Sequence, residues 1–166
     1  MLLGLSLSTF TTVHVAISLI GIFSGIVVLI AMLAGKNLDV WTAIFLGTTV
    51  LTSVTGFMFP SSGFTPAQGV GTLSLVVLAA AILAFYIFRL AGVWRWVYVI
   101  GASIALYFNV FVAVTQGFQK LSFLQPLAPT QSEPPFLVAQ LIVLAVFIAL
   151  CVKALRAFHP RVGASA

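Results

Sequence analysis

Charged side chains are scarce in this sequence. Only 5% of its 166 residues are charged, whereas 62% are hydrophobic. Soluble domains carry about 25% charged residues because water has to solvate their surface. This composition excludes a soluble domain and indicates a protein whose outer surface faces lipid.

Metal-ligating side chains are equally rare. The chain has one cysteine, Cys151, and two histidines, His14 and His159. A lone cysteine excludes an internal disulfide. A haem held by two histidines needs both imidazoles at one depth, whereas these two lie near opposite ends of the chain. Zinc and copper sites usually need three or four clustered ligands. We therefore expect no metal site within one chain, with metal binding left open only through His14 with Glu133 or between subunits. The sequence names no cofactor.

Motifs of nucleophilic catalysis and glycine-rich phosphate loops are missing too, which favours a function other than catalysis. The net charge of +5 does not indicate nucleic-acid binding, because the seven Lys and Arg residues are scattered at the ends of apolar runs. The partners that we expect for these cations are the phosphates of the lipid bilayer.

Long apolar runs fill most of the chain. A membrane-crossing helix needs about 20 apolar residues, and breaks around Gly35, Pro60, Gly92 and residues 119–135 separate five such runs. The sequence thus predicts one all-α domain, residues 1–166, that is an integral membrane bundle of five transmembrane helices. They are expected at residues 12–34, 40–59, 70–91, 94–118 and 136–158. Because the connection at Gly92 is very short, one continuous helix is the alternative there, although it would be too long for a bilayer.

The basic residues predict the orientation of the chain. Five crossings put the two termini on opposite sides, and Lys and Arg collect on the cytoplasmic side. Lys120 stands alone on one side, and six of the seven basic residues lie on the other: Lys36, Arg89, Arg95, Lys153, Arg156 and Arg161. Trp41, Trp94 and Trp96 fall at the same boundary, where indoles favour the headgroups. We expect the N-terminus outside and the C-terminus in the cytoplasm, in a bacterial inner membrane.

With this orientation, most intramembrane polar side chains gather in the outer leaflet, whereas the inner halves of the helices are mostly apolar. Polar groups are costly in a bilayer and usually face the bundle interior or a wet cavity. The sequence therefore predicts an outer-leaflet polar pocket. Its expected ligand-binding residues are His14, Ser18, Thr52, Thr55, Asn109, Gln116, Gln140 and Glu133.

Each of these residues also has a structural alternative. His14 can bond a lipid headgroup or a backbone carbonyl, and a threonine in a helix often bonds the carbonyl four residues back. The amide of Asn109 needs a partner, which is either another helix or a ligand. Glu133 precedes two prolines, where the positive end of a helix dipole favours a carboxylate.

Gly21 and Gly25 form a GxxxG motif on the first predicted helix. Small residues at this spacing let two helices approach closely in lipid. We expect this stripe to face the bundle interior, or to contact a membrane-protein partner or a second copy of the chain.

The leading hypothesis is a small multi-pass protein that binds a small or amphipathic ligand in the outer pocket, or that serves as an accessory subunit of a membrane complex. One alternative is a transporter of protons or a small solute that works as an oligomer, because the apolar inner halves leave no polar path through one chain. Another alternative is an intramembrane enzyme that uses His14 and Glu133 as its acid and base.

Overall fold

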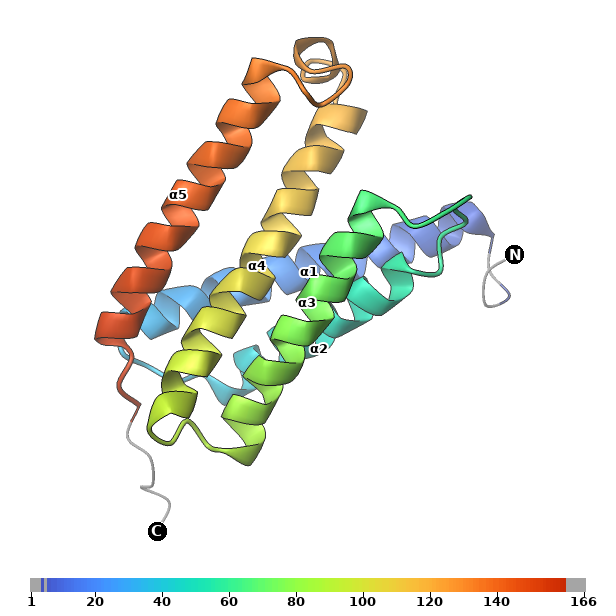
Figure 1. Ribbon diagram of the computed structural model, residues 1–166. Helices are drawn as coiled ribbons and strands as arrows, with labels where there is room; N and C mark the ends of the chain where they lie inside the picture. The colour runs from blue at the N-terminus through green and yellow to red at the C-terminus, as the bar shows by residue number, and fades with distance from the viewer. Residues whose placement is uncertain (1–3, 5, 161–166) are drawn as a thin grey trace.

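The computed structural model describes residues 4 and 6–160, and 78% of the chain is helical. The described residues contain no strand, so the predicted all-α fold is confirmed (Figure 1). The five α-helices are α1 (Leu7–Leu33), α2 (Asp39–Gly56), α3 (Pro66–Ile82), α4 (Val93–Lys120) and α5 (Pro134–Ala157). A π-helical turn, η1 (Leu83–Ile87), extends α3, and a 3-10 turn, η2 (Gln125–Leu127), lies between α4 and α5.

Four helices in the described part of the chain are long and apolar enough to cross a membrane: α1, α3 with its π turn, α4 and α5. Helix α2 is the exception. Its 18 residues give about 27 Å at a rise of 1.5 Å per residue, close to the hydrocarbon core of about 30 Å. Asp39, five threonines and Ser53 make it less apolar than the four candidate spans. The chain is thus a helical membrane protein.

Capping residues move two helix starts away from the predicted positions. Helix α1 begins before the predicted range 12–34, because the Ser6 hydroxyl accepts a hydrogen bond from the backbone N–H of Thr9. Helix α3 also begins earlier than expected. Thr65 and Gln68 form a reciprocal capping box at its start. Apolar continuity alone does not mark such ends.

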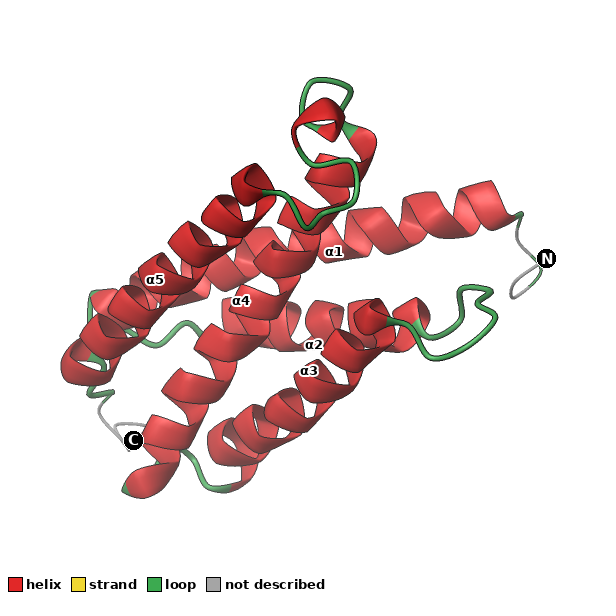
Figure 2. Cartoon of the chain, turned by 45° about the horizontal axis from the view of Figure 1, so that its top comes forward, coloured by secondary structure: helices red, strands yellow, loops and turns green. Residues whose placement is uncertain are grey.

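The short connection at Gly92 is a turn between two antiparallel helices, so the alternative of one continuous helix is excluded. Arg89, Leu90 and Gly92 have positive φ angles of 48°, 59° and 54°, which reverse the chain within a few residues (Figure 2). Helices α3 and α4 then pack closely. A Cβ at Gly101 would lie 3.1 Å from Cβ of Ala81.

The α1–α2 connection, the turn between η1 and α4, and the end of α5 lie together at one end of the bundle (Figure 1). We call it the basic end, because it carries Lys36, Arg89, Arg95, Lys153 and Arg156. The remaining basic residue of the predicted cytoplasmic set, Arg161, lies outside the described residues.

Arg95 ties the end of α5 to the start of α4 at the basic end. Its guanidinium donates hydrogen bonds to the carbonyl oxygens of Leu155, at 3.1 Å, and Phe158, at 2.5 Å. These carbonyls belong to the last turn of a helix, where no intrahelical donor is left for them. The arginine therefore caps α5 and fixes it to α4.

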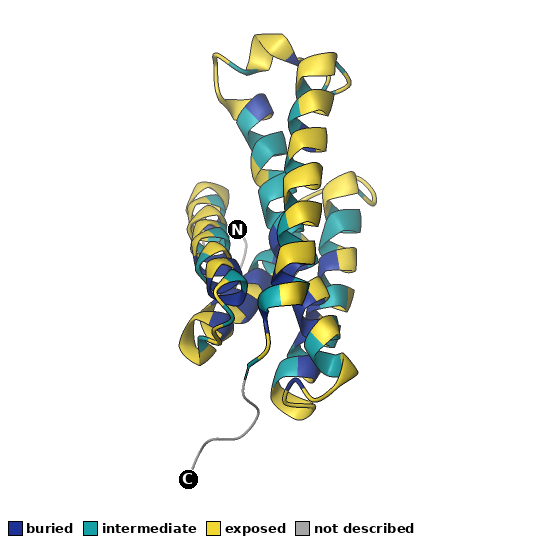
Figure 3. Ribbon diagram, turned by 90° about the vertical axis from the view of Figure 1, so that its left-hand side faces the viewer, coloured by how far each residue is buried: buried dark blue, intermediate teal, exposed yellow. Residues whose placement is uncertain are grey.

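The helices meet most closely near the basic end and spread apart beyond it. Helix α1 crosses α4 obliquely, whereas α5 runs alongside α4 (Figures 1 and 2). Buried residues concentrate where the helices meet (Figure 3). Only 6% of the apolar window of α5 is buried, and residues 107–117 of α4 are mostly half-buried. The outer surface of α5 is therefore available to lipid.

Candidate functional site

His14 joins α1 to α2 near the end of the bundle opposite the basic end. Its Nδ1 lies 2.7 Å from Oγ1 of Thr55. The ring is half-buried and packs edge-on against Phe59, with the ring centroids 5.1 Å apart. The partner of His14 is thus a side chain of another helix, and two predicted site residues meet here.

The Thr55 hydroxyl determines which nitrogen of His14 carries the proton. A hydroxyl has one proton to donate, and that of Thr55 lies 2.6 Å from the carbonyl oxygen of Leu51. Oγ1 of Thr55 must then accept from Nδ1–H of His14. In the neutral imidazole this leaves Nε2 as an acceptor, and no hydrogen bond to Nε2 occurs within the described residues.

Asn109 of α4 meets α1 and α2 about midway along them. Its Nδ2 donates to Oγ1 of Thr49 at 3.0 Å. Gly21 of α1 makes room for this contact, because a Cβ there would lie 3.3 Å from Oγ1 of Thr49 and 3.5 Å from Nδ2 of Asn109. The Oδ1 atom of Asn109 has no hydrogen bond among the residues described. The amide therefore keeps an unused acceptor.

Gly25, one turn further along α1, is packed more tightly than Gly21. A Cβ there would lie 2.6 Å from Cδ1 of Leu106 and 2.7 Å from Cε2 of Phe45. Both glycines of the GxxxG motif thus serve contacts with α2 and α4 of the same chain. Contact with a second chain through them stays a prediction.

The smaller hydroxyls of the predicted site behave differently from one another. Ser18 donates to the carbonyl oxygen of His14 at 2.7 Å within α1, which is the structural alternative. Thr55 also bonds its own helix while it holds His14. Thr52 does neither. Its Oγ1 is buried and has no hydrogen-bond partner in the described structure.

Gln140 belongs to a separate contact between α4 and α5. Its Nε2 donates to the carbonyl oxygen of Phe111 at 3.1 Å and to Oγ1 of Thr115 at 3.2 Å. The side chain is only 7% exposed, and its Oε1 has no partner among the residues that the structure covers. None of these bonds connects Gln140 to His14 or Asn109.

Gln116 and Glu133 belong to the end of α4 and the loop that follows it. Nε2 of Gln116 donates to Oε1 of Gln119 at 3.3 Å. The Glu133 carboxylate accepts from the hydroxyl of Thr130 at 2.8 Å and from the backbone N–H of Ser132 at 3.1 Å. It makes no side-chain cap on α5. Within the described chain, none of its hydrogen bonds leads to His14.

The loop lowers the pKa of Glu133. Desolvation acts in the opposite direction and raises it, but the hydrogen bonds from the Thr130 hydroxyl and from backbone N–H groups outweigh that effect. Hydrogen bonds to a carboxylate favour its charged form. Glu133 is therefore ionised at neutral pH, as a group that orders its own loop.

The predicted site residues thus fall into separate hydrogen-bonded groups. His14 with Thr55 and Asn109 with Thr49 lie along α2, whereas Gln140 and the loop around Glu133 belong to the α4–α5 pair. A common pocket for all of them stays a prediction. The part of the chain described by the structure contains no cluster of three His, Cys, Asp or Glu side chains that could hold a metal ion.

A polar pair near the basic end was not predicted from the sequence. The hydroxyls of Thr42 and Tyr98 lie 3.1 Å apart, and the two residues are 0% and 1% exposed. The inner half of the bundle is therefore less uniformly apolar than expected. Thr42 and Thr49 stand seven residues apart on one face of α2. This spacing indicates that the two threonines share a face but does not identify Tyr98 as the partner of Thr42.

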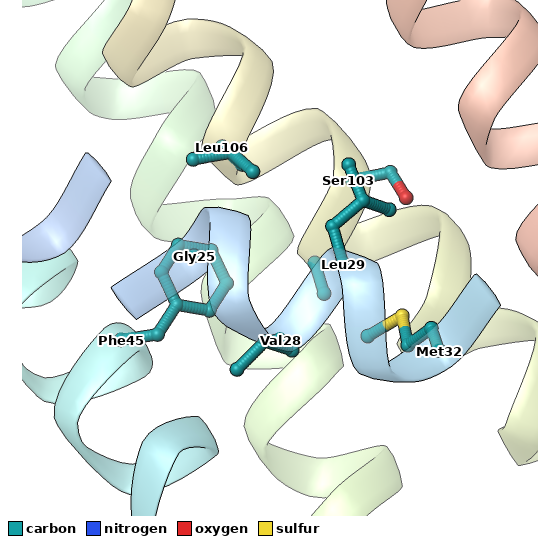
Figure 4. Close-up of a pocket in the computed structure, with 8 residues that line it drawn as sticks. Gly25, Val28, Leu29, Met32, Phe45, Ser103 and Leu106 are labelled. Carbon is teal, nitrogen blue, oxygen red and sulfur yellow. The ribbon is translucent and has the colours of Figure 1, made fainter. Parts of the chain in front are cut away.

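A narrow apolar pocket lies between α1, α2 and α4, in the half of the bundle nearer the basic end (Figure 4). It is too narrow at every point to admit a water molecule. Its walls include Gly25, Phe45 and Leu106, and the buried Oγ of Ser103, at its side, has no hydrogen-bond partner in the described structure. This pocket lies deeper than the predicted outer one.

No protein-family model, curated protein or solved structure matches this chain.

Proposed function

We propose that the protein is a five-helix inner-membrane protein that binds a small or amphipathic ligand in the outer leaflet, with His14 as the main polar contact. The single observation that carries this proposal is the hydrogen bond from Nδ1 of His14 to Thr55. This bond fixes the orientation of the ring and places the proton on Nδ1. Nε2, which has no partner within the described residues, can then accept a proton or a hydrogen bond from a ligand.

Other unused polar groups support the same assignment. Oδ1 of Asn109 and Oγ1 of Thr52 have no partner within the described residues, and the half of α4 beyond Asn109 is only half-buried. Ligand sites combine apolar walls with a few orienting polar groups. An amphipathic molecule would place its polar head near His14 and its apolar part against α4 and α5.

The proposed topology has α2 as a fifth crossing, the N-terminus outside and the C-terminus in the cytoplasm. It is supported by the α1–α2 connection, the turn between η1 and α4 and the end of α5, which lie together at one end of the bundle (Figure 1). These segments carry Lys36, Arg89 and Arg156, and basic residues favour the cytoplasmic side. A C-terminal fusion to alkaline phosphatase tests it in a bacterial host. The fusion should be inactive, and an active one would contradict the orientation.

Native mass spectrometry of the protein in mild detergent tests ligand binding. We expect a bound mass on the wild-type protein that is lost in His14→Ala and reduced in Asn109→Leu. Thr72→Val is the matched control, because the Thr72 hydroxyl is exposed and bonds only Gln68 of its own helix. Equal bound mass in all four proteins would reject the site.

A role as an accessory subunit is favoured by a different observation, the exposure of α5. Its residues Leu137, Leu141, Ile142 and Ile148 are all exposed, so that either lipid or a partner helix covers them. A photocrosslinking amino acid at Ile142 distinguishes the two in native membranes. Adducts with one defined protein would support the subunit role, and adducts with lipid alone would contradict it.

A further inference from the structure

Polar side chains follow the buried side of α2 along its length. Three of the five buried residues of this helix, Thr42, Thr49 and Ser53, carry hydroxyls. A threonine in a membrane helix commonly bonds its own helix. Here Thr42 pairs with Tyr98 instead, and Thr49 accepts from Asn109. Ser53 donates to the carbonyl oxygen of Thr49 in its own helix, so that Thr42 and Thr49 supply the polar contacts between helices.

The polar side chains reach both ends of α2. Asp39 is exposed at the basic end and lies three residues before Thr42, on the same face of the helix. At the other end Thr55 holds the half-buried His14. From Asp39 to Thr55 the helix rises about 24 Å, which is most of the thickness of a hydrocarbon core.

One apolar segment interrupts this series. Thr42 and Thr49 are seven residues apart on α2, a rise of about 10 Å, which is too long for a direct hydrogen bond. Phe45 lies between them, and its ring packs against Gly25, with Leu106 of α4 close to the same glycine (Figure 4). The narrow pocket at this point does not admit water.

Two buried hydroxyls beside this segment lack partners. Oγ of Ser103, which lines the pocket, and Oγ1 of Thr52, three residues beyond Thr49, have none in the described structure. An unpartnered buried hydroxyl is costly, and a water molecule next to it would satisfy it. Both therefore favour hydration whenever the helices separate slightly.

We propose that one chain conducts protons through water along these groups, and that Phe45, Leu106 and Gly25 form an apolar gate, closed in this structure. We call the route the α2 path; its residues are Asp39, Thr42, Tyr98, Thr49, Asn109, Thr52, Thr55 and His14. Each water or hydroxyl oxygen of the route accepts one proton and releases another, His14 accepts a proton at Nε2 and releases one from Nδ1, and the Asn109 amide only positions water. No atom or electron is gained or lost. Apolar constrictions close membrane pores by excluding water. The α2 path shares His14, Asn109 and Thr52 with the proposed ligand site, but it needs no bound ligand.

The chemistry of the α2 path favours protons over metal cations. Between Asp39 and His14 it offers hydroxyls and one amide and contains no carboxylate. Selective passage of a metal cation needs rings of oxygen atoms that replace its hydration shell. Single hydroxyls joined by water can pass a proton without such rings.

Proton flux into liposomes that contain the purified full chain tests the gate. A pH-sensitive dye inside reports the flux, which a potassium diffusion potential drives. We expect Phe45→Ala to raise the initial rate about tenfold over the wild-type protein, equivalent to about 1.4 kcal/mol off the barrier. Leu106→Ala tests the same gate from α4 if the first variant does not fold. Leu51→Ala, on the exposed side of α2, is the control and should leave the rate unchanged.

The route is tested in the opened protein. Adding Thr42→Val and Tyr98→Phe to Phe45→Ala should return the flux to the wild-type rate. The proposal is overturned if both gate variants conduct no faster than Leu51→Ala, or if the raised flux survives loss of the Thr42 and Tyr98 hydroxyls. A parallel rise in sodium uptake would also overturn it, because the open path would then not be selective for protons. Loss of ligand in native mass spectrometry reports on the other proposal and leaves this outcome unaffected.

Discussion

Nδ1 of His14 lies 2.7 Å from Oγ1 of Thr55, and this hydrogen bond joins α1 to α2 across 41 positions of sequence. It also explains the lone histidine near the start of a long apolar helix. The imidazole is held by a neighbouring helix, and its second nitrogen remains available.

Removal of the Thr55 hydroxyl should weaken the α1–α2 contact. Thr55→Val keeps the shape of the side chain but leaves Nδ1–H of His14 without its acceptor. We expect a loss of about 1 kcal/mol in the free energy of unfolding, measured with denaturing detergent in bicelles. Thr72→Val should have almost no effect, because its hydroxyl bonds only its own helix.

Nitrogen-15 NMR of the neutral imidazole of His14 in the wild-type protein should show the proton on Nδ1. A proton on Nε2 would contradict the hydrogen bond from Nδ1–H to Thr55.

A methyl group at Gly25 should disturb the centre of the bundle. In Gly25→Ala the new Cβ would lie within 3 Å of Leu106 and Phe45, and such overpacking costs typically about 1–3 kcal/mol. Gly47→Ala on α2 is the matched control, because nothing lies within 4 Å of its Cβ position. That variant should be neutral or slightly stabilising, since alanine favours a helix over glycine. Similar unfolding free energies for the two variants would argue against the close packing of α1.

The arginine cap of α5 should be needed to keep the end of this helix ordered. Arg95→Ala removes two charge-assisted hydrogen bonds to Leu155 and Phe158, which are worth about 1.5–3 kcal/mol for such groups. Hydrogen exchange of residues 154–158 should become faster, whereas the centre of α4 should be little changed. Lys153→Ala removes an exposed charge one turn away and should leave the exchange unaltered.

The loop around Glu133 should lose order in acid. Its carboxyl has a pKa below the ordinary value, so its stabilising contribution is fully present above the pKa of the unfolded chain. That contribution is lost as the pH falls through the lower pKa of the folded loop. The amide proton shifts of Thr130 and Ser132 should titrate with a midpoint below that of Glu133 in a peptide of residues 127–136. Glu133→Gln should abolish the transition, and a midpoint at or above that of the peptide would contradict the hydrogen bonding.

The sequence was sufficient for the helices because hydrocarbon imposes a simple requirement. In lipid every backbone N–H and C=O needs a partner within the segment, so that a long apolar run becomes a helix. The helix starts were less predictable, since Ser6 and Thr65 act through a few local hydrogen bonds. The position of the turn before Gly92 was predicted, but its backbone conformation was not, because Arg89 and Leu90 adopt positive φ angles that residues other than glycine rarely adopt.

The sequence identified the polar residues inside the membrane more readily than the residues with which they form hydrogen bonds. His14, Thr55 and Asn109 stand out in an apolar chain, since polar side chains are rare in membrane helices. Thr42 and Tyr98 did not stand out, because each lies near a helix start where polar residues are common. Only their hydrogen bond, between residues 56 positions apart on two helices, reveals that they form a buried pair.

By itself the sequence determined that this is a helical membrane protein, because too few charged side chains are present to solvate a water-exposed surface. It also determined where nearly all the chain is helical and which few side chains have to find polar partners. Only the tertiary structure decided which residues are those partners. They are Thr55 for His14, Thr49 for Asn109, and Phe111 with Thr115 for Gln140. A hydrogen bond needs its two atoms within about 3 Å, and that separation depends on how the helices cross and where a glycine lets them approach.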